Sequence, residues 1–272
     1  MYLDYWGLSE FPFSNVPDSR FFYKSRAHRE SLTRLSYLCT YQHGAGILVG
    51  PFGSGKTLLG FVLLNSINQE DRFRSAFIRN PRVSPLELLQ LIAGELGALS
   101  MPRNKAEALK SIETCLHNNI LDGRHTIIMI DEAHSIEGED VFEEVRLLLN
   151  FQLEDAHLLT LILIGQPGID VKVDRHKPLS QHVNLIVNLS AFSLSETEGY
   201  IRHRLQVVGR RDEVFNAEAM GALFRVSGGL PRRINHLCDS SLLEGFLADA
   251  EQVDREIVLQ AASISRSQRS SP

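Results

Sequence analysis

The sequence predicts an α/β fold, in which a parallel sheet is covered by helices on both faces, followed by a smaller all-helical domain. Two observations lead to this prediction. Short and nearly unbroken apolar runs alternate with helical stretches up to about residue 190, and strands that are buried on both faces have this composition. After Ala191 the strand-like runs stop and only helical stretches follow. We therefore expect a three-layer core with a small helical domain after it.

The expected core covers residues 26–190. It begins with a helix over residues 26–41, where Leu32, Leu35 and Leu38 recur at helical spacing. The expected strands cover residues 45–49, 75–78, 126–130, 159–164 and 183–189, and the expected helices between them cover residues 56–67, 85–96 and 141–151.

Three further segments flank this core. Residues 1–25 are aromatic and rich in turns; they are too irregular for a helix and too apolar for disorder, so we expect them to pack on the core. Residues 191–264 are expected to form a helical lid, and residues 265–272, which are rich in serine and arginine, a flexible tail. The helices expected in the lid cover residues 195–208, 216–226, 231–248 and 253–263.

The composition is that of an ordinary globular protein, with 272 residues, 43% of them hydrophobic, and a net charge of −5. This charge gives no general attraction to nucleic acid. The three cysteines are far apart and lack metal-ligand spacing. Asp4 and Glu10 in the first residues argue against a signal peptide, and no apolar run approaches the ~18 residues of a membrane span. We expect a soluble, cytoplasmic protein that reaches the inner membrane only through a partner.

Charge is unevenly distributed along the chain. Residues 131–155 are strongly acidic, whereas arginines crowd the C-terminal part. Such a run usually marks a solvated helix face, and the alternative is a surface that faces phosphates. The arginines in question are Arg202, Arg204, Arg210, Arg211, Arg225, Arg232 and Arg233.

The segment Gly50–Thr57, GPFGSGKT, matches the phosphate-loop pattern in full and lies between an expected strand and an expected helix. Its glycines allow backbone N–H groups to surround phosphate oxygens at a helix N-terminus. Lys56 can reach the β- and γ-phosphates of ATP, and the Thr57 hydroxyl suits Mg²⁺. The alternative is a glycine turn that binds nothing. The expected ATP-binding residues are Gly50, Pro51, Phe52, Gly53, Ser54, Gly55, Lys56, Thr57 and Leu58.

A second acidic motif, Asp131-Glu132, follows the apolar run of residues 126–130. Ligands of parallel sheets bind at the carboxyl ends of the strands. We expect Asp131 to hold Mg²⁺ through water, and Glu132 to orient or deprotonate the water that attacks ATP. Ala133 and His134 complete a DEAH string, but other helicase motifs are missing, so His134 is expected to be a local hydrogen-bonding residue.

Two more polar residues are candidates for contact with the γ-phosphate. Gln166 follows the expected strand over residues 159–164, although a residue of this type also suits a simple turn. Arg232 lies in Gly228–Arg233, which opens an expected helix of the lid, and could give the lid a contact to nucleotide. The alternative for Arg232 is an exposed arginine at a helix start.

Together, these motifs resemble those of AAA+ ATPases of the secretion-protein-A (ExeA-like) type, which includes ATPases of MSHA pilus biogenesis. The resemblance runs from Met1 to about Ala262 and implies a P-loop NTPase core of the AAA+ type. It also implies a ring or filament of subunits with ATP at their interfaces, a role in secretion or pilus assembly, Gln166 as sensor 1 and Arg232 as sensor 2. The matching motifs are YWGL at 5–8, PF at 12–13, PDSRFFY at 17–23, HRESL at 28–32, NPR at 80–82, DEAH at 131–134, RLL at 146–148, GQP at 165–167 and GGLPR at 228–232.

The sequence departs from this family in one catalytic position. Relatives place arginines in the stretch that matches Leu179–Val183, where an arginine finger is expected, and this chain has Ser180 and His182 there. Arg175 is the nearest arginine and is the candidate to act across an interface. Larger members of the family also continue into a membrane span and a cell-wall-binding domain, beyond the point where this sequence stops.

Two other functions remain open. The same core resembles the DNA-coating transposition regulators of the TniB and TnsC kind, and the arginines of residues 202–233 fit that alternative. A nucleotide-binding switch with little hydrolysis follows if the finger is truly missing. The lack of an LSGGQ-like sequence before Asp131 argues against an ABC transporter subunit.

Overall fold

The computed structural model describes residues 2–153 and 156–267. The chain divides into two compact units. The sheet unit comprises residues 27–52 and 56–189, and the helical unit comprises residues 1–26, 53–55 and 190–272, so the tip of the loop at Gly53–Gly55 groups with the helices. Among the described helices, none combines the length and the hydropathy needed to span a bilayer.

The sheet unit contains a five-stranded sheet in the order β2-β3-β6-β1-β7, and every neighbouring pair is parallel. The three central strands are buried along their whole length, as their unbroken apolar composition predicts. The expected α/β class with a parallel sheet is confirmed. The strands are β1 (Ala45–Val49), β2 (Phe73–Ile78), β3 (His125–Ile130), β6 (Leu159–Gly165) and β7 (Val183–Asn188).

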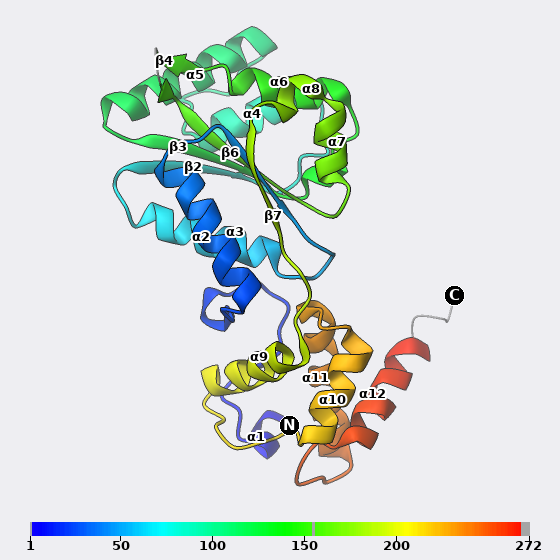
Figure 1. Ribbon diagram of the computed structural model, residues 1–272. Helices are drawn as coiled ribbons and strands as arrows, with labels where there is room; N and C mark the ends of the chain where they lie inside the picture. Colours follow the sequence, from blue (N-terminus) through cyan, green and yellow to red (C-terminus); the bar gives the residue numbers. More distant parts are fainter. Residues whose placement is uncertain (1, 154–155, 268–272) are drawn as a thin grey trace. The chain divides into compact units, whose positions relative to one another are not determined.

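Helices cover both faces of this sheet, with α2 and α3 on one face and α4 to α8 on the other (Figure 1). Gly46 allows α2 to approach β1 closely, because a Cβ atom there would lie 2.6 Å from Leu38 Cδ2. A short antiparallel ribbon is formed by β4 (Gln152–Leu153) and β5 (Ala156–His157). The helices are α2 (Arg26–Thr40), α3 (Lys56–Asn68), α4 (Pro85–Glu95), α5 (Lys105–Leu121), the 3₁₀ turn η2 (Ala133–Ser135), α6 (Glu139–Leu148), α7 (Ile169–Arg175) and α8 (Lys177–Ser180).

One long helix of the sheet unit, α5, has no counterpart among the expected elements. Asn104 caps its N-terminus by accepting from the Glu107 N–H. Ala108, Ile112 and Leu116 are fully buried on one face, at the four-residue spacing of a helix. The remaining positions are mostly polar, so the segment contains no long apolar run.

The helical unit packs the N-terminal segment, from residue 2 to residue 25, against the C-terminal helices around a shared apolar core. The expectation that this segment packs on the sheet-containing core is therefore wrong. Trp6 is 2% exposed and its Nε1 donates to the Leu242 carbonyl at 2.9 Å. Residues Tyr2–Trp6 also form a short helix, α1, where none was expected. The other elements are the 3₁₀ turn η1 (Ser19–Phe21), α9 (Leu194–Val207), α10 (Ala217–Ser227), α11 (Pro231–Leu247) and α12 (Arg255–Ser267).

Arg204 on α9 is 4% exposed and holds the N-terminal segment in place. Its guanidinium donates to the carbonyls of Pro12 and Ser14 and to the Tyr200 hydroxyl. The expected solvated arginine face is therefore wrong at this position, because tertiary contacts bury the residue. The expected flexible tail, residues 265–272, lies outside the described residues from residue 268 onward, and α12 includes residues 265–267.

Candidate nucleotide-binding site

The predicted site residues of the sheet unit follow three adjacent strands, β1, β6 and β3. The phosphate loop follows β1, Asp131 follows β3 and Gln166 follows β6. Because the strands are parallel, their carboxyl ends meet at the same edge of the sheet. The Gly50 N–H donates to the Gly165 carbonyl at 3.2 Å, which joins the start of the loop to the end of β6.

The loop between β1 and α3 has a backbone that only glycine adopts readily. Gly53 and Gly55 have φ angles of +80° and +95°. Helix α3 begins at Lys56, so the loop leads into a helix N-terminus with unpaired N–H groups and a partial positive charge. Ser54 is fully buried, and its hydroxyl has no hydrogen-bond partner among the described residues. A buried hydroxyl of this kind is satisfied when a phosphate oxygen accepts from it.

Lys56 is 6% exposed, and the one hydrogen-bond acceptor of its ammonium within the described chain is the Pro51 carbonyl, at 3.0 Å. An ammonium has three donors, so two remain for a ligand. Burial lowers the pKa of Lys56, while the nearby carboxylates of Glu132 and Asp131 act in the opposite direction. A bound polyphosphate would offset the unfavourable burial of this charge.

Thr57 and Asp131 contact each other directly. The Thr57 hydroxyl donates to Asp131 Oδ2 at 2.6 Å. Asp131 is 4% exposed, and its Oδ1 accepts from the Glu132 N–H at 2.9 Å. The described residues contain no group of three or more His, Cys, Asp or Glu side chains that could hold a metal ion. This pair suits Mg²⁺, which usually takes one or two protein ligands and completes its shell with phosphate and water.

Glu132 differs sharply from its neighbour. Its backbone is left-handed, with φ of 52°, and its side chain is 42% exposed. Glu132 Oε2 lies 3.3 Å from His134 Nε2. Asp131 is therefore buried and hydrogen-bonded at the sheet edge, while the Glu132 carboxylate can reach water.

His134 links the acidic motif to the end of β6. The Gln166 N–H donates to His134 Nδ1 at 3.3 Å, and Gln166 Nε2 lies 2.8 Å from His134 Nε2. Lys172 holds the same turn, because its ammonium donates to the carbonyls of His134 and Ile136. Lys172 belongs to no motif, so nothing in the sequence pointed to it. The contact of His134 with Gln166 depends on the register of β3 and β6.

The two predicted arginines lie in different units. Arg232 is in the first turn of α11, and its N–H donates to the carbonyl of Gly53, also in the helical unit, at 3.1 Å. A Cβ atom on Gly53 would lie 2.7 Å from Arg232 Cβ, so this approach requires glycine. Arg175 is the last residue of α7 and is exposed. Within the described chain, no hydrogen bond or ion pair joins Arg175 to Thr57, Asp131 or Glu132.

Comparison with known sequences gives a consistent result. Residues 39–172 match the family model of the AAA domain. The chain is 33% identical to general secretion pathway protein A of Aeromonas hydrophila, over 97% of this chain and 49% of that protein. It is 23% identical to an uncharacterized HTH-type transcriptional regulator of Methanocaldococcus jannaschii, over 62% and 41% of the two chains. The chain thus spans about half or less of the length of these curated relatives.

Solved structures share the fold at low sequence identity. The Aeropyrum pernix ORC2 protein, in ADPNP-ADP complexes, aligns with a TM-score of 0.71 and 16% identity over 94% of this chain and 71% of that chain. Drosophila ORC bound to DNA gives 0.71 and 18% over 96% and 65%. The Thermotoga maritima RuvB Holliday junction branch migration motor gives 0.60 and 18% over 87% and 68%. The phosphate loop, the acidic strand end and these similarities agree: the chain belongs to the AAA+ family of P-loop nucleotide-binding proteins, in its secretion-protein-A type.

Proposed function

We propose that this chain binds Mg²⁺-ATP at Gly50–Leu58 and hydrolyses it. The observation that carries the proposal is the partly buried 2.6 Å contact between Thr57 Oγ1 and Asp131 Oδ2. This contact joins the phosphate-loop motif to the acidic motif, and the two residues are 74 positions apart in the chain. A hydroxyl and a carboxylate in this arrangement serve as ligands of Mg²⁺ in P-loop proteins.

Each residue of the sheet edge then has one task. The loop N–H groups and Lys56 hold the phosphates, and Ser54 adds a hydroxyl donor. Thr57 and Asp131 hold Mg²⁺, which neutralises charge on the phosphates when it is bound. Glu132 orients the attacking water and accepts its proton, a role that fits its exposed carboxylate.

Gln166 and Arg232 are proposed to respond to the γ-phosphate, as sensors 1 and 2. The contacts of His134 with Gln166 and Glu132 support a shared arrangement, in which a change at Gln166 reaches the catalytic carboxylate. His134 is thus proposed as a positioning residue.

We further propose that the ATP cycle drives or regulates the assembly of a larger complex in secretion or pilus formation. The 33% identity with general secretion pathway protein A supports this choice. Subunits would form a ring or filament with ATP at their interfaces, and Arg175 of one subunit would supply positive charge to the ATP of the next.

The stretch Leu179–Val183, where relatives carry an arginine finger, also supports a second candidate, a nucleotide-binding switch with little hydrolysis. Burial lowers the pKa of His182, and the nearby His157 and Arg146 lower it further. The imidazole is therefore mostly neutral at pH 7 and a weak substitute for arginine. Low activity of the isolated protein follows from either candidate. Activation of hydrolysis on assembly separates them, because only the first predicts it.

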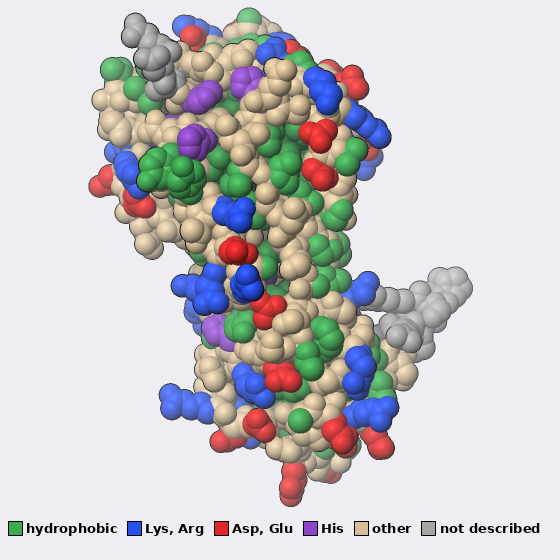
Figure 2. Space-filling view, in the orientation of Figure 1, with side chains coloured by type: hydrophobic (Ala, Val, Ile, Leu, Met, Phe, Trp, Pro, Cys, Tyr) green, Lys and Arg blue, Asp and Glu red, His purple; other side chains and the backbone are tan. Residues whose placement is uncertain are grey.

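The DNA-binding alternative has less support. Arg204 is buried and bound to backbone carbonyls, and Arg202 is paired with Glu198 and Glu213. Figure 2 shows cationic and anionic side chains interspersed on the visible face, without a continuous basic area. DNA binding that weakens steeply with salt would reverse this preference, since phosphate contacts release counterions.

The binding step is tested with Lys56→Ala. Losing a charge-assisted contact to phosphate weakens ATP affinity by about hundredfold. Titration calorimetry with Mg²⁺-ATP measures this, and Lys110→Ala, an exposed lysine of α5, is the control with unchanged affinity. If Lys56→Ala binds ATP as tightly as the control, the loop is not the site.

A further inference from the structure

The outer strand β7 is a feature that ATP binding does not explain. It is hydrogen-bonded to β1 alone, and within the described chain no other strand pairs with its free edge. Its sequence, VNLIVN, has neither charge nor proline. The one register shift occurs at its start, which leaves Leu185–Asn188 regularly paired with β1. Native proteins usually protect such an edge with charges, proline, bulges or a covering segment.

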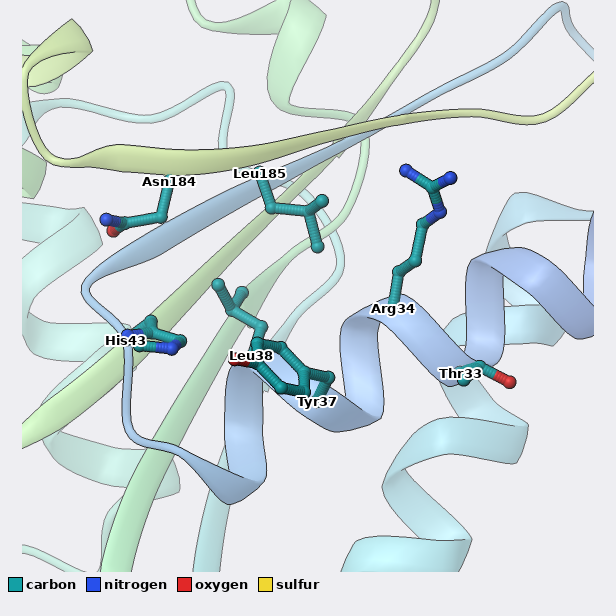
Figure 3. A pocket seen from close by; sticks show the side chains of 7 residues that line it. All are labelled: Thr33, Arg34, Tyr37, Leu38, His43, Asn184 and Leu185. Atoms are coloured by element: carbon teal, nitrogen blue, oxygen red, sulfur yellow. The ribbon is translucent and has the colours of Figure 1, made fainter.

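A groove of about 530 Å³ lies beside this strand, between β7 and α2. Figure 3 shows Leu38 of α2 and Leu185 of β7 facing each other across its middle. Arg34 extends toward β7 at one end, and His43 and Asn184 lie at the other. The groove therefore has an apolar centre and polar ends, which is the usual character of a peptide-binding cleft.

Exposed aromatic rings border the groove. Tyr37 is 55% exposed and Tyr41 is 62% exposed, with ring centroids 4.5 Å apart. The Tyr37 ring also lies 5.6 Å from that of His43. Exposed rings gathered beside an apolar groove are typical of interaction sites, because tyrosine supplies a large contact area with few rotatable bonds.

Charge indicates what the groove accepts. Arg34 is the one Lys or Arg that lines it, and no Asp or Glu does. A second copy docked about a twofold axis would bring another Arg34 and another edge without carboxylates, so self-pairing lacks charge complementarity. A single arginine is also little for a nucleic acid, whose affinity depends on many phosphate contacts.

We propose that the groove binds an extended segment of a partner polypeptide, which adds a strand to β7, places an apolar side chain against the half-buried Leu185, and gives a carboxylate to Arg34. Strand addition supplies backbone hydrogen bonds and leaves alternate side chains to fill pockets. Residues i and i+2 of an extended chain lie roughly 7 Å apart, so the acidic residue belongs two positions from the apolar one. This site is separate from the nucleotide-binding residues and does not depend on ATP hydrolysis.

The proposal is tested on the full chain with fluorescein-labelled heptapeptides, Glu-Thr-Val-Thr-Val-Thr-Val and its reverse, to allow either strand direction. We expect saturable anisotropy changes and slower amide hydrogen exchange in residues 183–189. Peptides with Lys in place of Glu should bind less. Two further peptides are N-methylated at alternate peptide bonds, one in each register. Each keeps its side chains but loses the backbone N–H donors along one edge. The peptide that is methylated on the edge facing β7 should not bind.

Variants of the chain locate the contact. Arg34→Glu should weaken binding about five- to tenfold and Tyr37→Ala about tenfold. Arg29→Glu, the same charge reversal at an exposed position of α2 outside the groove, should change it by less than about twofold.

Three results would overturn the proposal. One is the absence of binding by both acidic peptides, or equal binding by both N-methylated registers. Another is an effect of Arg34→Glu no larger than that of Arg29→Glu. The third is another occupant: concentration-dependent dimers of the chain alone that protect residues 183–189, or a single-stranded oligonucleotide that displaces the peptide and loses affinity in Tyr37→Ala.

Discussion

The two units each bury a cation, and the two cations have opposite surroundings. In the helical unit, Arg204 donates to two backbone carbonyls and a tyrosine hydroxyl, and its guanidinium lies 4.5 Å from the centroid of the Phe21 ring. In the sheet unit, Lys56 is nearly as buried but has one carbonyl acceptor among the described residues. Most of the Arg204 donors are used inside the protein, and most of the Lys56 donors are not.

We interpret this difference as the one between a structural charge and a charge that is kept for a ligand. Burial of an incompletely bonded ammonium is unfavourable, so it persists only where something else is gained. The neighbours of Lys56 fit this account, since the Ser54 hydroxyl has no partner in the described chain and Thr57 contacts Asp131. Incomplete bonding of a buried charge is therefore a stronger indication of a site than burial alone.

The largest expected effect is on the sheet edge, in Glu132→Gln. Glutamine keeps the shape of the side chain but cannot accept a proton from water, so hydrolysis should fall by roughly 10²–10⁴ while ATP still binds. Phosphate release measured at saturating Mg²⁺-ATP checks this, with Glu139→Gln, an exposed position at the start of α6, as the control. Full turnover in Glu132→Gln would move the catalytic role elsewhere, with Asp131 the next candidate.

The second effect is on the helical unit, in Arg204→Ala. This change leaves the carbonyls of Pro12 and Ser14 without their donor, and we expect it to lower the free energy of unfolding by about 3 kcal/mol. Trp6 is the single tryptophan of the chain and is buried in this unit. Its fluorescence during urea unfolding therefore reports the unfolding of the helical unit.

Two controls make this second test specific. Arg202→Ala removes only exposed ion pairs and should lower stability by less than about 1 kcal/mol. Lys56→Ala should leave the Trp6 transition in place although it loses ATP. Equal losses in Arg204→Ala and Arg202→Ala would show that the buried contacts of Arg204 contribute nothing.

The sequence predicted what is local in this structure. The apolar runs located all five strands of the large sheet to within about two residues. The three central strands are apolar throughout because they are buried on both faces, and the outer strands β2 and β7 keep enough apolar residues to be found. The loop Gly50–Thr57 and the pair Asp131-Glu132 were found because their spacing is fixed by the ligand they would hold. The structure places Thr57 and Asp131 in contact, and their roles toward ATP remain predictions.

Long-range packing was not predictable in the same way. Aromatic residues such as Trp6 and Phe13 show that a segment is buried but not which partner covers it, and here the partner is the C-terminal helices. Arg204 lies in a run of arginines that composition assigns to solvent, and only the tertiary structure shows its carbonyl acceptors. His134 and Gln166 are 32 residues apart, and only strand register brings them together.

The last and smallest expected effect concerns His125, a buried and incompletely bonded residue that is uncharged at pH 7. It shows that the comparison of Arg204 with Lys56 applies only to charged groups. His125 at the start of β3 is 2% exposed, its Nε2 lies 2.9 Å from Thr160 Oγ1, and its Nδ1 has no partner in the described chain. It resembles Lys56 in being incompletely bonded, yet it lies at the opposite end of the strand from Asp131. Burial lowers the pKa of His125 to about 4, with the nearby His157 contributing, so the ring is neutral at pH 7 and its burial is far less unfavourable than that of an ammonium.

The pH dependence of unfolding tests this distinction. The unfolded chain has a histidine pKa near 6.5, so between pH 6.5 and 4 it binds more protons than the folded chain, and stability falls as the pH falls through this window. Between pH 7 and 5, His125 should account for about 2 kcal/mol of that loss. His125→Leu should remove this part and leave stability near pH 7 within about 1 kcal/mol, because the Thr160 hydroxyl keeps the His43 carbonyl as its acceptor. Urea unfolding followed by circular dichroism at pH 7, 6 and 5 measures the difference. Parallel curves of unfolding free energy against pH for the unchanged chain and His125→Leu would mean that His125 is not buried as a neutral ring. Incomplete bonding of a buried side chain would then indicate a ligand site at His125 as well as at Lys56.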